Sequence, residues 1–263
     1  MSDETPMRLG GMAMRNGLLI HGPTSWAVAA RAEDGSIQVA SGPKPSLARG
    51  KLAKVPLLRG PLRLAEAFAV VPLARMRLSS ARLPFEDPAV AGAMVTSAGA
   101  SGALRRLRAP SVGRETAIAL LGALPALTAL RNRDLAAYHG VEHKAIGGYE
   151  QGRDPAEMPK EHERCGSNLV GPMVLLSIAG QLLTERLARR PGPIVRGAAS
   201  LAGVGAAVEL FVYFERHPRS PVARAVHGSG HEIQRRFSTR EPTEGQLEVG
   251  KAALDEILRV EAT

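Results

Sequence analysis

Residues 165–184, CGSNLVGPMVLLSIAGQLLT, decide the fold class of this chain, because all twenty lack a charged side chain. A helix that crosses the hydrocarbon core of a bilayer needs about 20 predominantly apolar residues. A second run, residues 197–214, carries one charge, Glu209, and two shorter uncharged runs cover residues 88–104 and 116–130. We therefore predict a mainly α protein, a membrane-associated helical bundle in which two to four helices are embedded.

The amino-terminal residues follow a different pattern and predict a small β-rich unit. Trp26–Ala30 and Ser36–Ala40 are short strand candidates, and Asp34 with Gly35 between them is typical of a hairpin turn. We assign residues 1–56 to this N-terminal β-rich unit and residues 57–263 to the helical membrane-associated domain. The single cysteine excludes an intrachain disulfide.

The charge balance indicates an anionic partner. Lysine and arginine number 34 against 25 aspartate and glutamate residues, and the pI is near 10.4. Such a surface attracts anionic lipid, nucleic acid or an acidic substrate. Because only 3% of the residues are aromatic, the chain offers few platforms on which bases could stack. We therefore expect membrane lipid as a partner and rank nucleic acid last.

The sequence YHGVEHK, residues 138–144, predicts a metal site. If this segment is helical, His139 and His143 stand at i and i+4 and share one face. The order HxxEH has the spacing of the inverzincin motif, in which the histidines bind zinc and the glutamate takes the proton of the attacking water. His162 and Cys165 follow at a spacing of three and add nitrogen and sulfur donors. We predict His139, His143, His162 and Cys165 as ligands of zinc or, second, iron, and Glu142 as the general base.

Several of these residues have a plainer interpretation. A histidine pair at helical spacing can be an exposed polar face, and a single cysteine is usually a buried small hydrophobe. Glu209 is either a further ligand or base of the metal site or the partner of an arginine. Lys144 is expected in solvent. His227 and His231 are discounted as ligands, because the intervening glycines predict a flexible loop.

The chain resembles, over nearly its whole length, the bacterial membrane protein family typified by YqhQ. That family is a domain of unknown function, described as a predicted metal-dependent enzyme without a settled substrate. The resemblance implies a place in the bacterial cytoplasmic membrane, with the site on the cytoplasmic side. It is carried, in order, by Gly10 and Gly11, Trp26–Ala29, PLLRG at 56–60, Tyr138–Lys144, His162–Gly166 and STREP at 238–242. Met12, Asn16 and His21 depart from the usual family pattern.

Two classes of function follow. The first is a metal-dependent membrane enzyme of hydrolytic type, in which water attacks a carbonyl or phosphoryl centre of an unknown substrate. The second is a non-enzymatic membrane scaffold or regulator whose metal is structural and fully enclosed by four ligands. A protein partner, or a second copy of the chain, fits either class.

Overall fold

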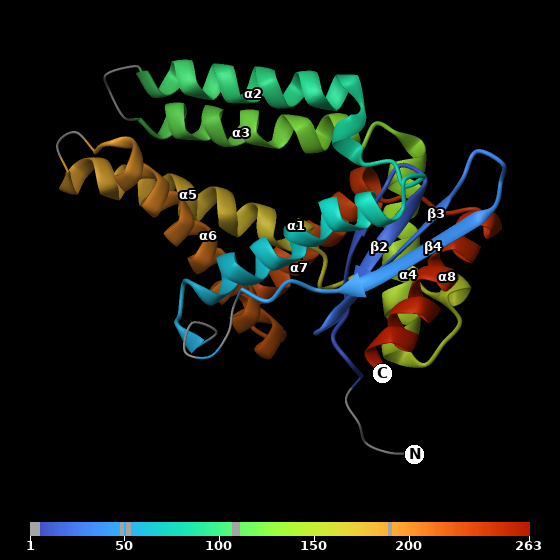
Figure 1. The fold of residues 1–263 in the computed structure, drawn as a ribbon. Coiled ribbons are helices and arrows are strands. Elements are labelled where there is room, and N and C mark those ends of the chain that lie inside the picture. Colours follow the sequence, from blue (N-terminus) through green and yellow to red (C-terminus); the bar gives the residue numbers. More distant parts are fainter. Residues whose placement is uncertain (1–5, 48–49, 51–53, 107–110, 189–190) are drawn as a thin grey trace.

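The computed structural model describes residues 6–47, 50, 54–106, 111–188 and 191–263. Within these residues the protein is mainly helical, with a small antiparallel sheet at the amino terminus, as the sequence predicts (Figure 1). The strands are β1 Gly10–Ala13, β2 Gly17–His21, β3 Ser25–Arg31 and β4 Ile37–Pro43. The α-helices are α1 Arg59–Arg77, α2 Pro88–Arg106, α3 Val112–Ala129, α4 Arg133–Gln151, α5 Ser167–Leu187, α6 Pro193–Arg216, α7 Pro221–Ile233 and α8 Glu244–Glu261. Short turns of helix are η2 Pro84–Glu86, η3 Pro155–Glu157 and the π-helical η4 Gln234–Ser238.

The sheet is a meander in the order β1-β2-β3-β4, with every neighbouring pair antiparallel. The predicted strands lie in β3 and β4, and the turn between them contains Gly35 at φ 84°. Glycine adopts this left-handed conformation without a steric cost. Strands β1 and β2 extend the sheet beyond the predicted hairpin.

The central strands β2 and β3 are buried on both faces. Successive side chains of a strand point to opposite sides, so these strands contribute to two cores. Leu18 and Ile20 of β2 pack with Val141 of α4 and Ile257 of α8. On the other face, Leu19 of β2 packs with Val70 of α1. The first core joins the amino-terminal sheet to the carboxyl-terminal helix, and the boundary at residue 56 stays a prediction.

Two helical hairpins, α2–α3 and α5–α6, project from the same side of the sheet (Figure 1). Helices α5 and α6 pack through small and polar residues: the amide of Gln181 donates to the Ser200 hydroxyl at 2.8 Å, and Gly203 lies against Ser177. Small residues of this kind let helix backbones approach closely, as in membrane interfaces. Near the tips, the buried Arg114 of α3 pairs with Glu185 of α5 at 2.9 Å. This ion pair ties the two hairpins to each other.

Two helices in the described part of the chain are long and apolar enough to cross a membrane, the segments Ser167–Leu187 and Ile194–Arg216. Only 17% and 22% of their most apolar windows are buried inside the protein. A core helix of a water-soluble protein would be mostly buried, so these two helices present their apolar side chains outward. Leu175, Leu187, Ile194 and Leu201 are among the exposed ones.

Candidate metal centre

Helix α4 carries the HxxEH motif and runs through the middle of the protein. The side chain of Asn132 caps its first turn by accepting hydrogen bonds from the backbone of Asp134 and Leu135, and Gly152 ends it at φ 63°. His139 and His143 lie one turn apart on the same face, with their ring centroids 4.5 Å apart. The segment is therefore helical, as the predicted site requires.

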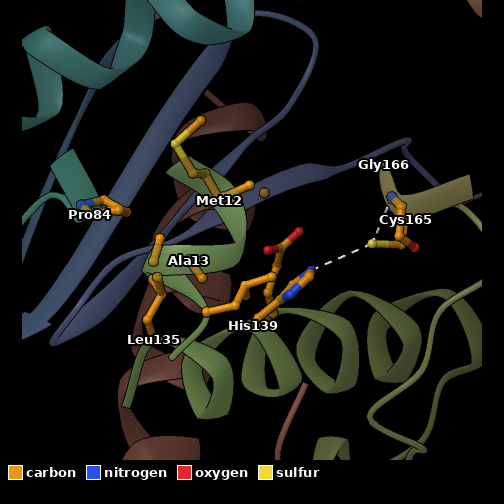
Figure 2. Close-up of a pocket in the computed structure, with 13 residues that line it drawn as sticks. Met12, Ala13, Pro84, Leu135, His139, Cys165 and Gly166 are labelled. Atoms are coloured by element: carbon orange, nitrogen blue, oxygen red, sulfur yellow. Dashed lines mark hydrogen bonds between the residues drawn. The ribbon is translucent and has the colours of Figure 1, made fainter. Parts of the chain in front are cut away.

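The chain brings Cys165 to this histidine pair from just before α5. The Cys165 Sγ lies 3.5 Å from Nε2 of His139 (Figure 2). One ligand atom from each of His139, His143 and Cys165 lies within 4.8 Å of the other two. We call these three residues the His/Cys trio. Donor atoms this close together, drawn from two imidazoles and a thiol, are a set that suits zinc or iron.

Backbone carbonyls fix the orientation of both imidazoles. Nδ1 of His139 donates to the carbonyl oxygen of Ser238 at 2.8 Å, and Nδ1 of His143 donates to that of Lys160 at 2.6 Å. Because a carbonyl only accepts, the proton of each neutral ring sits on Nδ1 and Nε2 keeps its lone pair. The Nε2 atom of His143 is buried and has no hydrogen-bond partner. A metal ligand commonly shows this arrangement, with its second nitrogen held by an outer partner.

Burial sets the protonation states of two residues of the trio, His143 and Cys165. Burial, reinforced by His139, lowers the pKa of His143 to about 3, so this imidazole is neutral. Burial also raises the pKa of the Cys165 thiol. The His143 imidazole is thus ready to bind a cation, whereas the thiol must first release its proton.

Glu142 lines the same cavity as His139 and Cys165. Burial raises its pKa to about 7, near the value suited to a general base. Gly11 of β1 leaves room for this side chain, since a Cβ there would lie 2.6 Å from Cγ of Glu142. The amino-terminal sheet therefore shapes the site, although the sequence assigns it no residue of the site.

The cavity in front of the trio has a volume of about 350 Å³. Met12, Ala13, Pro84 and Leu135 form one wall, and Cys165 and Gly166 lie on the opposite side (Figure 2). Its full lining is Gly11, Met12, Ala13, Pro84, Ala126, Ala129, Leu130, Leu135, His139, Glu142, Cys165, Gly166 and Ser167. The cavity reaches the trio at His139 and Cys165, which leaves a position open on that side, as in a catalytic metal site.

His162 lies next to the trio without joining it. Its ring centroid is 5.8 Å from that of His143. Its Nδ1 accepts a hydrogen bond from the backbone of Arg164, and its Nε2 lies 3.3 Å from Oε2 of Glu150. Both ring nitrogens are therefore engaged, and the role of His162 as a ligand stays a prediction.

A family model described as a protein of unknown function, DUF1385, matches residues 118–260. The chain belongs to the DUF1385 family. No curated protein and no solved structure matches it. The matched DUF1385 region contains the whole trio, Glu142 and Ser238, while Gly11 lies outside it.

The segment 238–242 of the DUF1385 region supports helix α4. Its Ser238 carbonyl holds His139, and the backbone N–H of Arg240 donates to the carbonyl of Ala136 at 2.9 Å. A Cβ on Gly140 would overlap the carbonyl oxygen of Arg240, so only glycine allows this approach. The sequence singles this segment out, but its contacts with His139 and Ala136 are made by its backbone atoms.

Lys144 is buried, which corrects the expectation that it lies in solvent. Its Nζ donates to the carbonyls of Met158 at 2.6 Å and Ala156 at 3.3 Å, and pairs with Glu241 at 2.7 Å. These acceptors offset the cost of burying the ammonium. Lys144 thereby ties the loop that follows η3, and segment 238–242, to α4.

Replacing Lys144 with methionine is expected to destabilise the DUF1385 region by about 2–4 kcal/mol, because the carbonyl of the buried Met158 loses its donor and Glu241 loses its partner. Chemical denaturation measures the change. Lys251→Met is the matched control, since Lys251 pairs with Asp154 of the same loop at the surface. The control should cost less than about 1 kcal/mol. Equal losses in the two variants would contradict the structural role of Lys144.

Three other candidates from the sequence lie away from the trio. Glu209 pairs with Arg59, whose Nε lies 2.7 Å from its Oε1, which is the plainer of its two predicted roles. His227 and His231 lie on helix α7, so the predicted flexible loop is wrong. Helix formation prevails there despite Gly228 and Gly230, because Ser220 caps the first turn and Pro221 starts it. His231 borders a second cavity with His143 and His162.

Proposed function

We propose that this protein is a membrane-bound, metal-dependent hydrolase. Supporting this function is the His/Cys trio, whose three ligand atoms converge within 4.8 Å and two of whose residues, His139 and Cys165, line an open cavity. Three protein ligands with an open position are typical of catalytic zinc sites, whereas structural sites are closed by four. The resemblance to the YqhQ family, with its expected metal-dependent activity, agrees with this proposal.

His139, His143 and Cys165 would hold the metal, with zinc preferred over iron for a set of two imidazoles and one thiolate. The buried, unpartnered Nε2 of His143 supports this fit. When bound, zinc would lower the pKa of a water molecule enough for that water to lose a proton and attack at neutral pH. Glu142 accepts the proton of that water and passes it to the leaving group. One water is consumed, and the bond to the leaving group breaks without any change of oxidation state.

The membrane part of the proposal rests on α5 and α6, whose apolar side chains face outward. We place the protein in the bacterial cytoplasmic membrane with the site on the cytoplasmic side, in contact with lipid. Helix α5 begins at Ser167, two residues after the ligand Cys165. The metal site would then lie at the boundary between the bilayer and water.

Elemental analysis of the detergent-extracted protein tests the proposal. Stoichiometric zinc or iron is expected, and Glu142→Gln should retain the metal while losing turnover of ester or phosphoester substrates. A folded protein free of metal would contradict the proposal. Retained metal with Glu142→Gln indistinguishable from wild type in function would favour the scaffold instead.

The affinity for zinc is expected to rise about tenfold per pH unit between about pH 7 and 8. Binding releases the thiol proton, and because burial raises the pKa of Cys165, the thiolate fraction still grows tenfold per unit in this range. His143 adds no slope, since its pKa of about 3 leaves it neutral. Competition with a chromophoric chelator measures the affinity, and Cys165→Ala should flatten the profile. An equally steep profile in that variant would show that the thiol is not a ligand.

A further inference from the structure

The cavity beside the trio is polar at one end and apolar along the rest of its wall. His139, Glu142, Cys165 and Ser167 supply the polar side chains. The rest of the lining includes Ala126 and Ala129 from the last turn of α3, Leu130 directly after it, and Met12 and Leu135. A ligand that fills this space therefore needs a polar group at the trio and a hydrocarbon part beside α3.

The apolar wall continues onto the outer surface of the helical hairpins. Leu127, next to the lining residue Ala126, is 57% exposed on α3. Val170, one turn beyond the lining residue Ser167, is exposed on α5. A hydrocarbon chain could thus pass from the surface that we place in the membrane to the trio while remaining in apolar surroundings.

The charge distribution around the cavity favours the same orientation of a ligand, with its polar group at the trio. Helix α5 points its amino terminus at the cavity, and the positive end of a helix dipole attracts a polarised or anionic group. The unpartnered Nε2 of His143 indicates that a cation belongs beside it. The amino terminus of α5 lies at the polar end, and His143 belongs to the trio whose other members, His139 and Cys165, line that end, so the scissile group of a substrate would bind there.

We infer that the substrate is an amphiphile with a long hydrocarbon chain, whose ester or phosphoester group binds at the trio while the chain lies against α3. This inference rests on the proposed function and names its substrate class. In the reaction, the oxygen of water bonds to the carbonyl carbon or the phosphorus. The bond to the leaving oxygen breaks, and that oxygen receives the proton held by Glu142.

Alkyl hydroxamates test the inference, because their head group chelates zinc and their chains can be lengthened without being cleaved. Binding to the zinc-loaded protein in lipid nanodiscs would be measured by calorimetry for chains of two, six and ten carbons. Burial of each methylene is expected to tighten binding about three- to fourfold. The metal-free protein in the same discs corrects for partitioning of the probe into lipid.

Ala126→Trp should abolish the gain with chain length and leave the two-carbon probe bound as in wild type. Leu120→Trp is the matched control, because Leu120 is exposed on α3 and does not line the cavity, and it should keep the gain. If Ala126→Trp does not fold, Ala129→Leu fills the same wall with a smaller side chain.

The possible failures are distinguishable. Absence of zinc from the wild-type protein would overturn the proposed function itself. Bound zinc with a probe affinity independent of chain length, or with Ala126→Trp and Leu120→Trp behaving alike, would overturn only the inference about the substrate.

Discussion

Replacing His143 with alanine is expected to strip the purified protein of its metal, with a loss in zinc affinity of about a thousandfold, or about 4 kcal/mol. The side chain is buried, its Nδ1 is held by the carbonyl of Lys160, and its Nε2 has no partner within the protein. No other residue of the trio can move into the space that the ring leaves, because His139 is itself held by Ser238. Zinc titration against a chelator of known affinity measures the loss.

Two further histidine variants test whether the loss of metal is specific to His143. His217→Ala removes an exposed histidine at the end of α6 and should retain full affinity. His162→Ala should also retain most of the zinc affinity, since both nitrogens of that ring are engaged by Arg164 and Glu150. If His162→Ala loses the metal as completely as His143→Ala, the site has four protein ligands and the structural role gains support. Zinc retained by His143→Ala would refute the trio.

Introducing two arginines, Leu175→Arg with Leu201→Arg, is expected to remove the protein from the membrane fraction. Both leucines are exposed, at 69% and 61%, and lie near the middle of α5 and α6. An arginine at the centre of a membrane helix costs about 2.5–3.5 kcal/mol on insertion scales, so the two together would shift insertion by several orders of magnitude. Fractionation of cells followed by carbonate extraction measures the distribution.

The control for this experiment is Phe237→Arg, an exposed aromatic residue in η4, outside both hairpins. It should remain in the membrane fraction. In water, exchange of an exposed leucine for arginine usually changes stability by less than about 0.5 kcal/mol. A double variant that stays folded and keeps the distribution of wild type would therefore contradict embedding of α5 and α6.

Uncharged runs predicted the helices of the hairpins well, because their length and composition are visible in the sequence itself. Strands β1 and β2 escaped prediction for two physical reasons. Residues 10–13 begin with two glycines, which are depleted in strands, and Leu18, Leu19 and Ile20 are buried on both faces, which removes the alternation that marks a half-exposed strand.

The spacing of side chains in the sequence predicted which ligands of the site lie together, whereas the contacts made by backbone atoms could not be predicted. The i, i+4 rule placed His139 beside His143, and the donor chemistry of Cys165 pointed to the same centre. The carbonyls of Lys160 and Ser238 carry no sequence signature, since every residue has one. The burial of Lys144 likewise depends on carbonyls at 156 and 158 and on a distant glutamate, contacts that exist only after the chain has folded.

The hydrogen bond from His139 to Ser238 has a consequence for how the protein is made. During synthesis, the HxxEH helix leaves the ribosome about a hundred residues before the carbonyl that orients its first histidine, and α8, which covers one face of the sheet, comes later still. A nascent chain therefore contains the three residues of the trio before it contains the Ser238 carbonyl that orients His139. Metal loading would be a late event in biogenesis, after translation is nearly complete.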